Sequence, residues 1–295
     1  MGIVESNLVI ALVSGIDRPG IIHRVAKFIF ENGGNVIDQS QFTDPQDATF
    51  FMRTVFDITE FKLSPEKMVR SLADTCGKIG LEVKLFFPTQ KRVAILVTKD
   101  EHCLRDILFH KNIGEFEMDV PLIISNHPDL KYIADMEKIP FQLFYNSKKA
   151  KSTDDKRNWN GERNDRIYDA LEGLNVDLVV LAKYMQLITG KLLEGFPNRI
   201  INIHHGDPGF SGADPYGQAF DRGVKTIGAM AHFATSELDA GPILVQRQAS
   251  VTHKHTREDF HRIGRENERL ALIEAIRLCL ENRVIVHKNR TIIFD

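Results

Sequence analysis

The sequence predicts an α/β protein in which a small ferredoxin-like βαββαβ domain precedes a doubly wound, Rossmann-like domain with a mostly parallel sheet. Three observations support this prediction. About 80 residues at the N-terminus follow the order strand, helix, strand, strand, helix, strand. From Arg92 onward, strands and helices alternate along the chain. The run VDLVVLA at residues 176–182 is almost continuously apolar, which is typical of strands buried on both faces of a parallel sheet.

Each N-terminal element has a local signal. Residues 8–13 are apolar and are followed by the turn residues GIDRPG. After this turn, apolar residues recur at helical spacing, and two glycines then end the helix. Two alternating stretches flank the turn TDPQD, as in a hairpin, and Ser64-Pro65 opens a second helix that runs to about Cys76. The predicted elements are strand 8–13, helix 21–30, strands 36–42 and 49–58, helix 65–76 and strand 81–87.

The C-terminal elements follow the alternation expected of a doubly wound sheet. They are strand 92–98, helix 103–110, strand 120–125, helix 130–136, strand 176–182 and strand 199–203. The polar stretch at residues 146–166 mixes acidic and basic side chains, so we interpret it as an exposed linker or the start of a helix rather than a basic binding patch. Because the pattern changes near residue 87, we place a first domain at residues 1–87 and a second at residues 88–295.

Composition and charge exclude several classes of protein. The chain has 295 residues, of which 43% are hydrophobic and 26% charged, as in ordinary soluble proteins. The net charge of −2 and the lack of a basic stripe argue against a nucleic-acid partner. No apolar run reaches about 18 residues, so we expect no membrane span. Three widely spaced cysteines fit the reducing cytoplasm.

A candidate site lies at the end of strand 199–203. Asn202 and His204 are two residues apart, so their side chains leave the same face of the strand. In open α/β sheets, ligands bind beyond the carboxyl ends of the strands. An amide N–H and a protonated imidazole can both donate to the oxyanion that forms during acyl transfer. The alternative is that both residues are structural polar groups that cap the strand end.

A second stretch, residues 227–246, is predicted to form strand, turn and strand, and its turn SELDAGP carries Asp239. A carboxylate at such a position can orient a nucleophile, stabilise an imidazolium or accept a proton. Asp before Ala-Gly-Pro is also a common turn former, so a structural role is the alternative. We interpret His232, in the first of the two strands, as structural.

Both stretches resemble the family of formyltransferases that use 10-formyltetrahydrofolate. The family's signature Asn-Ile-His corresponds to residues 202–204, and its Leu-Asp-x-Gly-Pro turn to residues 238–242. Within that family the formyltetrahydrofolate deformylases are the most similar, through the segments DRPGI, ISNHPDL, VDLVVLAKYMQ, RIINIHH and RGVKTIGAMAHF. The N-terminal domain resembles ACT regulatory domains. The resemblance covers nearly the whole chain, and it implies a ferredoxin-like ACT domain followed by a Rossmann-like formyltransferase domain.

The resemblance implies hydrolysis of 10-formyltetrahydrofolate to formate and tetrahydrofolate, with water in place of an amine acceptor. Asn202 and His204 would hold the formyl oxygen and stabilise the tetrahedral oxyanion. Asp239 would position or deprotonate the water and help to move a proton to the leaving nitrogen. The folate is the substrate, and no cofactor is expected. The residues expected to contact it are Tyr184, Met185, Leu187, Leu238 and Gly241.

The resemblance to ACT domains also implies regulation. Such domains pair and bind small amino acids at their interface, through a loop similar to GIDRPGI here. Glycines allow close backbone approach, and a helix N-terminus favours a carboxylate. We therefore expect a homo-oligomer with glycine or methionine as candidate effectors; a purely structural dimerisation domain is the alternative. The residues expected to contribute are Asp17, Arg18, Pro19 and Gly20.

One departure from the family concerns the acceptor. Purine-synthesis relatives place a glycine-containing phosphate loop after the first strand of this domain, whereas residues 98–106 here are TKDEHCLRD, which disfavours a phosphorylated acceptor. His102 and Cys103 could be ligands or a nucleophile, and we favour a bulky plug that closes the acceptor site. An isolated pair, His253 and His255, is too weak a signal to predict a metal centre.

Other departures surround the candidate site. After His205 the chain continues Gly-Asp-Pro-Gly, where the family usually has Ser-Phe-Leu-Pro-Ala, so we predict a more open loop at residues 206–209 and slower hydrolysis. Further unusual residues are Asp214, Gly217, Met230 and Arg247. Two other functions therefore stay open: formyl transfer to another small acceptor, and an amino-acid-responsive folate-binding protein with little turnover.

Overall fold

The structure is a computed structural model that describes residues 7–144, 153–205 and 214–295, apart from the side chains of residues 153–160. The chain folds into two compact units. The first comprises residues 1–89, 281–287 and 292–295, and the second comprises residues 90–280 and 288–291. None of the helices that the structure describes combines the length and the hydropathy needed to cross a membrane.

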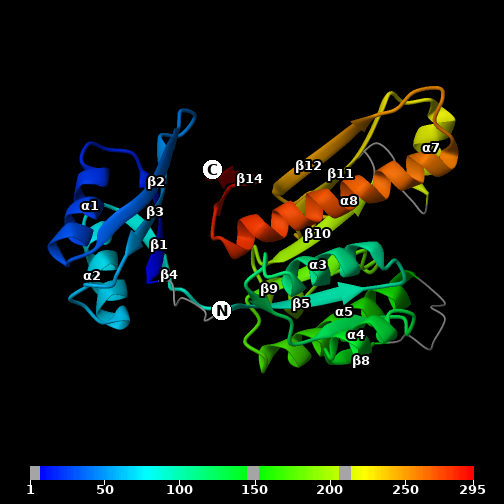
Figure 1. The fold of residues 1–295 in the computed structure, drawn as a ribbon, viewed down its shortest axis with the longest axis horizontal. Helices are drawn as coiled ribbons and strands as arrows, with labels where there is room; N and C mark the ends of the chain where they lie inside the picture. The colour runs from blue at the N-terminus through cyan, green and yellow to red at the C-terminus, as the bar shows by residue number, and fades with distance from the viewer. Residues whose placement is uncertain (1–6, 145–152, 206–213) are drawn as a thin grey trace. The chain divides into compact units, whose positions relative to one another are not determined.

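The first unit is a four-stranded antiparallel sheet with two helices, as the sequence predicts (Figure 1). Its strands are ordered β2-β3-β1-β4, which is the ferredoxin-like arrangement. The elements are β1 (Leu8–Ile16), α1 (Ile21–Glu31), β2 (Asn35–Asp44), β3 (Thr49–Asp57), α2 (Pro65–Gly77) and β4 (Leu81–Phe86).

Different elements cover the two faces of this sheet. Val9 and Ala11 of β1 form a core with apolar residues of α1 and α2. Leu12 points to the other face, because side chains alternate along a strand, and it packs there with Phe51 and Phe294. The strands that precede Phe294 form a C-terminal hairpin of β13 (Val284–His287) and β14 (Arg290–Ile293).

The second unit is built on a mostly parallel sheet ordered β12-β11-β10-β9-β5-β7-β8, with β6 beside β5. The pairs from β10 to β8 are parallel, whereas β11 and β12 run antiparallel to their neighbours. The strands are β5 (Lys91–Val97), β6 (Met118–Asp119), β7 (Ile123–Ser125), β8 (Phe141–Leu143), β9 (Leu178–Ala182), β10 (Ile200–His205), β11 (Thr226–Phe233) and β12 (Ile243–Ser250). The helices are α3 (His102–Asn112), α4 (Lys131–Glu137), α5 (Thr153–Glu172), α6 (Lys191–Gly195), α7 (Pro215–Arg222) and α8 (Arg257–Leu280).

The observed bounds of several elements differ from the predicted ones by a few residues, and two segments need an explanation. The strand expected at residues 120–125 is shorter, because Pro121 has no N–H to donate to the ladder, and β7 begins only at Ile123. The polar stretch at residues 146–166 contains the start of α5 from Thr153 onward, so the helix-start alternative holds there. Residues 146–152 lie outside the described residues.

The sheet of the second unit brings the predicted site residues to one end. Every residue of β9 is buried, as its apolar run predicts. β10 pairs with β9 in parallel and with β11 in antiparallel register. The long helix α8 packs along β10, β11 and β12 and also contacts α3 (Figure 1). Side chains at the carboxyl ends of β9 and β10 therefore lie near one another and near α3 and α8.

Candidate active site

Asn202, His204 and Asp239 meet at the carboxyl end of β10. Ile201 and Ile203 are buried in the sheet, whereas Asn202 and His204 are only partly buried. Asp239 comes from the turn after β11, and its carboxylate oxygens lie 3.2 Å from His204 Nδ1 and 3.4 Å from Asn202 Nδ2. The structure thus brings together the three residues that the sequence suggested for acyl chemistry.

The turn that carries Asp239 depends on a glycine. Asp239 itself has a left-handed backbone, with φ 53°. A Cβ atom at Gly241 would lie 1.8 Å from the carbonyl oxygen of Phe233, so this position accepts no side chain without a shift of the turn. Asn289 Nδ2 donates to the carbonyl of Ala240 at 3.0 Å and steadies the same turn. The backbone therefore aims the Asp239 carboxylate at β10.

His232 also belongs to this site, although the sequence suggested a structural role. It stands opposite Asn202 in the β10–β11 ladder. Its Nδ1 lies 3.0 Å from the carbonyl oxygen of Phe233, so this nitrogen carries the proton and donates it. Its Nε2 lies 3.2 Å from Asn202 Nδ2 and 3.6 Å from an oxygen of Asp239. His232 consequently orients the side-chain amide of Asn202.

The two imidazoles control the charge of Asp239. The hydrogen bond from His204, and then the contact with His232, hold the pKa of the Asp239 carboxyl well below its usual range, although burial opposes them. The side chain is 29% exposed, so it is neither fully buried nor freely solvated. Asp239 is therefore an anion at neutral pH.

His205 follows His204 but lies in different surroundings. Its ring centroid is 5.6 Å from that of His204 and 6.4 Å from that of Tyr216. Burial, and then the nearby positive charge of Lys183, lower the pKa of His205 to about 4. The imidazole of His205 is therefore neutral at physiological pH.

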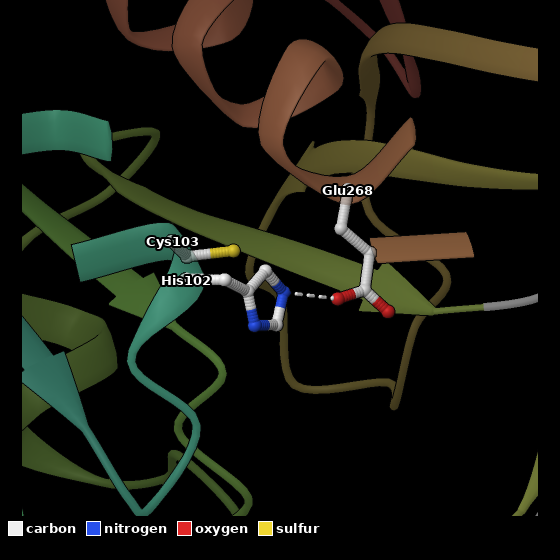
Figure 2. Close-up of side chains that lie close together, drawn as sticks. All are labelled: His102, Cys103 and Glu268. Atoms are coloured by element: carbon white, nitrogen blue, oxygen red, sulfur yellow. Dashed lines mark hydrogen bonds and ion pairs between the residues drawn. The ribbon is translucent and has the colours of Figure 1, made fainter. Parts of the chain in front are cut away.

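The segment expected to close an acceptor site forms the start of α3. His102 Nε2 lies 2.7 Å from the Glu268 carboxylate of α8, and Cys103 beside it is buried (Figure 2). Burial, and then the negative charge of Glu268, raise the pKa of the Cys103 thiol well above its usual value, so the thiol stays protonated and is a poor nucleophile. This arrangement favours the plug over a nucleophilic role.

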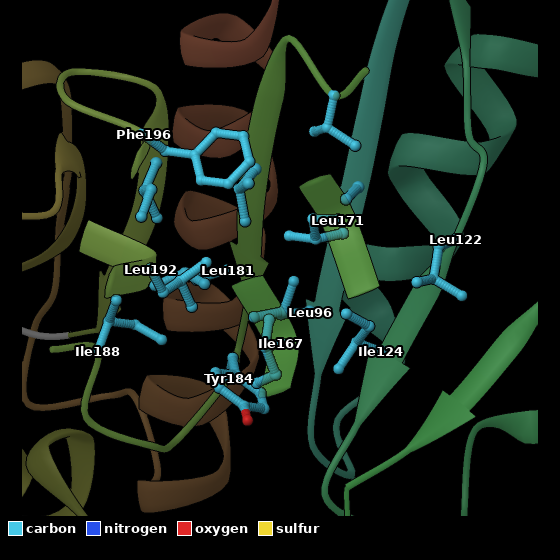
Figure 3. Close-up of a cluster of buried hydrophobic side chains, with 14 of the residues drawn as sticks. Leu96, Leu122, Ile124, Ile167, Leu171, Leu181, Tyr184, Ile188, Leu192 and Phe196 are labelled. Carbon is cyan, nitrogen blue, oxygen red and sulfur yellow. The ribbon is translucent and has the colours of Figure 1, made fainter. Parts of the chain in front are cut away.

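The residues expected to contact the substrate divide into core and surface. Tyr184 is 4% exposed and belongs to the hydrophobic core of the second unit (Figure 3). Gly241 is also buried. Met185, Leu187 and Leu238 are 52%, 40% and 70% exposed. Three of the five residues thus have exposed apolar side chains, whereas Tyr184 and Gly241 are buried.

The residues that depart from the family pattern lie in several environments. Asp214 caps α7, accepts from the Gly217 amide at 2.8 Å and pairs with Arg257 at 2.7 Å. Met230 is buried opposite His204 in the ladder. Arg247 of β12 forms an ion pair with Glu274 of α8. The predicted open loop, residues 206–209, lies outside the described residues.

Two clusters among the described residues have the donor atoms of a metal site, and neither includes His253 or His255. They are His102, Cys103 and Glu268 in the second unit, and Asp44, Asp47 and His287 in the first. His255 Nδ1 instead accepts a hydrogen bond from the Thr252 amide at 2.9 Å.

The candidate regulatory residues, Asp17 to Gly20, form an exposed loop between β1 and α1. Gly20 precedes α1 with a left-handed φ of 91° and offers no side-chain cap. The Asp17 amide donates to the carbonyl of Ala48 at 2.7 Å. The first turn of α1 therefore presents backbone N–H groups that no cap side chain satisfies.

The sequence matches the Formyl transferase family over residues 91–276. A formyltetrahydrofolate deformylase from Synechocystis sp. is 41% identical over 285 residues, which cover 96% of this chain and 97% of the relative. The formyltetrahydrofolate deformylase of Bacillus subtilis is 38% identical over 287 residues, covering 96% and 93%.

Solved structures of deformylases and transformylases are also similar to this chain. The crystal structure of a formyltetrahydrofolate deformylase from Pseudomonas syringae matches with a TM-score of 0.90 at 31% identity, covering 98% of this chain and 94% of that one. Glycinamide ribonucleotide transformylase 1 from Symbiobacterium toebii matches with a TM-score of 0.62 at 31% identity, covering 70% of this chain and 95% of that one. The similarity to the deformylase thus extends over more of the chain than the similarity to the transformylase.

Proposed function

The chain belongs to the formyl transferase family, and we propose that it is a formyltetrahydrofolate deformylase, which hydrolyses 10-formyltetrahydrofolate to formate and tetrahydrofolate. The observation that carries this proposal is the convergence of Asn202, His204 and Asp239 at the carboxyl end of β10. The nearly full-length similarity to proteins of that name supports it. We assign the chemistry to residues 88–295 and regulation to residues 1–87.

In the proposed reaction, a water oxygen attacks the formyl carbon and the bond from that carbon to N10 breaks. One proton of the water passes to N10, and the other is released as formate leaves. His204 and Asn202 donate to the oxyanion of the tetrahedral intermediate. The Asn202 amide contacts His232 at 3.2 Å and Asp239 at 3.4 Å. The second contact is long for a hydrogen bond, so the formyl oxygen can replace it while His232 keeps the amide in place.

Asp239 acts in this mechanism as a fixed anion. Because its pKa lies well below the usual range, its carboxylate is a weak proton acceptor at neutral pH. Its contact with His204 Nδ1 at 3.2 Å instead fixes the orientation of that imidazole. We therefore assign Asp239 to holding His204 and orienting the water, rather than to removing the water's proton.

The start of α3 supports hydrolysis over transfer. Residues 98–106 contain no glycine whose backbone could approach a phosphate closely. His102 turns inward and bonds with Glu268, and Cys103 is buried. We infer that these side chains close the acceptor site, whereas a water molecule needs little room.

The regulatory part of the proposal rests on the loop at residues 17–20. This loop is exposed and leads into a helix whose first turn lacks a side-chain cap, which suits the carboxylate of a small amino acid such as glycine or methionine. We also propose a homo-oligomer that works in the cytoplasm, where the free thiols of Cys76, Cys103 and Cys279 fit a reducing compartment.

The test is an assay of formate and tetrahydrofolate released from 10-formyltetrahydrofolate. The two products should appear in equal amounts. Asp239→Asn should retain tetrahydrofolate binding and lose about a hundredfold or more in turnover, because it removes the charge that holds His204. Asp135→Asn is the control, since Asp135 lies exposed in a surface ion pair on α4.

Three results would contradict this assignment. An N-formyl product made from an added amine, in place of formate, would identify a transferase. Tight folate binding without formate release would identify a binding protein. Turnover of Asp239→Asn within a few fold of the parent would remove Asp239 from the mechanism.

A further inference from the structure

Glu268 of α8 is a buried carboxylate that the proposed reaction does not use. It is 1% exposed and lies 2.7 Å from His102 Nε2, 3.1 Å from Lys183 Nζ and 3.0 Å from the Tyr216 hydroxyl. Burial alone would raise the pKa of Glu268, but His102 and Lys183 together hold it at about 2. Glu268 is thus an anion at neutral pH, with Lys183 as its buried cationic partner.

The same cluster offers metal-ligating atoms, yet its charges are already balanced. The donor atoms of His102, Cys103 and Glu268 lie within 4.8 Å of one another (Figure 2). The Lys183 ammonium already neutralises Glu268, and the Cys103 thiol is protonated. A metal ion bound here would leave Lys183 as an unpaired buried charge, which is strongly unfavourable. We therefore interpret the cluster as a buried ion pair between Lys183 and Glu268 rather than as a metal site.

Lys183 has an unusual backbone conformation at the carboxyl end of β9. It directly follows β9, is 7% exposed and has a φ of 62°. Residues other than glycine rarely adopt this left-handed conformation, and it persists where the surrounding structure holds it in place. The bond from Lys183 Nζ to Glu268 ties the end of the side chain to α8 and so supplies such a restraint.

From Lys183 the chain passes directly into the segment expected to contact the pterin. The Met185 amide donates to Thr98 Oγ1 at 3.1 Å. The Leu187 carbonyl accepts from Arg163 Nη2 at 3.1 Å. The side chains of Met185 and Leu187 stay 52% and 40% exposed. The segment therefore exposes two apolar side chains, while contacts of Lys183, Met185 and Leu187 hold it at its beginning, middle and end.

We propose that Lys183 and Glu268 are positioning residues for the folate substrate: their buried ion pair fixes the left-handed turn after β9 and holds Met185 and Leu187 where the flat pterin ring binds. This inference rests on the proposed function. Neither residue touches the reacting atoms in this scheme, so loss of the pair should weaken substrate binding more than it slows bond breaking.

The experiment removes the charge pair in two ways. Glu268→Gln keeps the size of the side chain and removes its charge. The double variant Lys183→Met/Glu268→Gln also removes the cation, so no unpaired buried charge is left to destabilise the fold. Arg269→Gln is the matched control, because Arg269 is the next residue of α8 and also pairs with α3, through Asp106, but is 45% exposed.

Calorimetry gives the Kd for tetrahydrofolate, steady-state assays give KM and kcat for 10-formyltetrahydrofolate, and thermal melting checks the fold. We expect Kd and KM to rise by about tenfold or more in both test variants, since displacement of a positioning segment by about 1 Å has large effects. We expect kcat to stay within a few fold of the parent. Arg269→Gln should match the parent in all of these measurements.

Folded test variants with unchanged Kd and KM would overturn the inference, as would a fall in kcat at unchanged binding. Failure of both variants to fold would overturn it too, because the pair would then serve the fold as a whole. A parent protein that releases no formate would instead refute the proposed function, and the Kd for tetrahydrofolate would still decide whether the ion pair positions a folate site.

Discussion

His205 shows how strongly the environment separates two neighbouring histidines. His204 contacts Asp239 through Nδ1 at 3.2 Å, whereas His205 packs beside Tyr216 and near Lys183. Burial first, and then the charge of Lys183, lower the pKa of His205 from 6.5 to about 4. The folded protein therefore keeps this imidazole neutral at a pH where the unfolded chain has already taken up a proton.

The free energy of unfolding should consequently fall as the pH drops from 6.5 toward about 4, because the unfolded state binds the proton first. With a His205 pKa of 6.5 in the unfolded chain and about 4 in the folded protein, the free energy of unfolding falls by about 2 kcal/mol between pH 7 and pH 5. His205→Gln should remove this part of the pH dependence, as measured by urea unfolding at the two pH values. The contributions of Asp239 and Glu268 are lost only at lower pH, because the ordinary pKa values of these carboxyl groups are 3.8 and 4.5. Equal pH dependence in variant and parent would contradict this assignment.

At the residue scale, sequence patterns identify groups that belong to motifs and miss groups that act through tertiary contacts. Asn202 and His204 were candidates because they share a strand face, and their roles remain predictions. His232 has no local signal, because it stands opposite Asn202 only through the pairing of β10 with β11. Glu268 is 85 residues from Lys183 and lies in a helix with many charged residues, so no spacing in the sequence marks it.

Among the elements, the turn between β11 and β12 leaves little room for a side chain at Gly241. Gly241→Ala would place a Cβ atom 1.8 Å from the Phe233 carbonyl oxygen, so the turn must move and take Asp239 with it. We expect turnover to fall about a hundredfold and the free energy of unfolding to fall by about 1–3 kcal/mol. Formate release and urea unfolding measure the two effects.

Gly161→Ala is the control for this substitution, because nothing lies within 4 Å of the added atom in α5. It should keep the activity of the parent. Parent-like turnover in Gly241→Ala would show that the close approach of this turn to β11 does not position Asp239.

Local patterns predict most of these elements, because their causes are local. The apolar run at residues 176–182 contains β9, and Pro65 begins α2 as expected. Pro121 shortens a predicted strand for an equally local reason, a missing N–H donor. Prediction is therefore least accurate at the ends of elements, where the loss of one backbone N–H donor can shorten a strand.

The C-terminal hairpin has a different origin, and we predicted no element for it. Phe294 packs with Leu12 in the core of the first unit. Arg53 donates to the carbonyls of Glu281 and Asn282, which are 228 and 229 residues away. The apolar runs at residues 284–286 and 292–294 are a local hairpin signal that our prediction did not use. The contacts of this hairpin with Leu12 and Arg53 have no such signal, because they join residues far apart in the sequence.

For the whole molecule, the fold of the second unit cannot by itself distinguish hydrolysis from transfer. The transformylase from Symbiobacterium toebii shares that fold with a TM-score of 0.62 over 70% of the chain. Related reactions use the same scaffold, and local groups decide the acceptor. Here the inward-facing side chains of α3 and the similarity to deformylases over 98% of the chain both favour water.

In the first unit, the loop at residues 17–20 is the site that we propose for a small amino acid. Gly20 keeps a left-handed φ of 91° with nothing within 4 Å of an added Cβ, so the space beside the loop is open. The first turn of α1 has no acidic residue and no side-chain cap. The positive end of the helix dipole at this turn therefore favours a carboxylate.

Calorimetry of the full chain with glycine, methionine and a panel of other amino acids should detect binding at millimolar concentrations or below, together with a change in the rate of formate release. Gly20→Ala should weaken that binding, because alanine is strained at this φ and the loop must shift. Gly77→Ala, where a new Cβ meets nothing within 4 Å and φ is not left-handed, should bind like the parent. If no amino acid binds at millimolar levels, the loop is no effector site, and the first unit serves assembly alone.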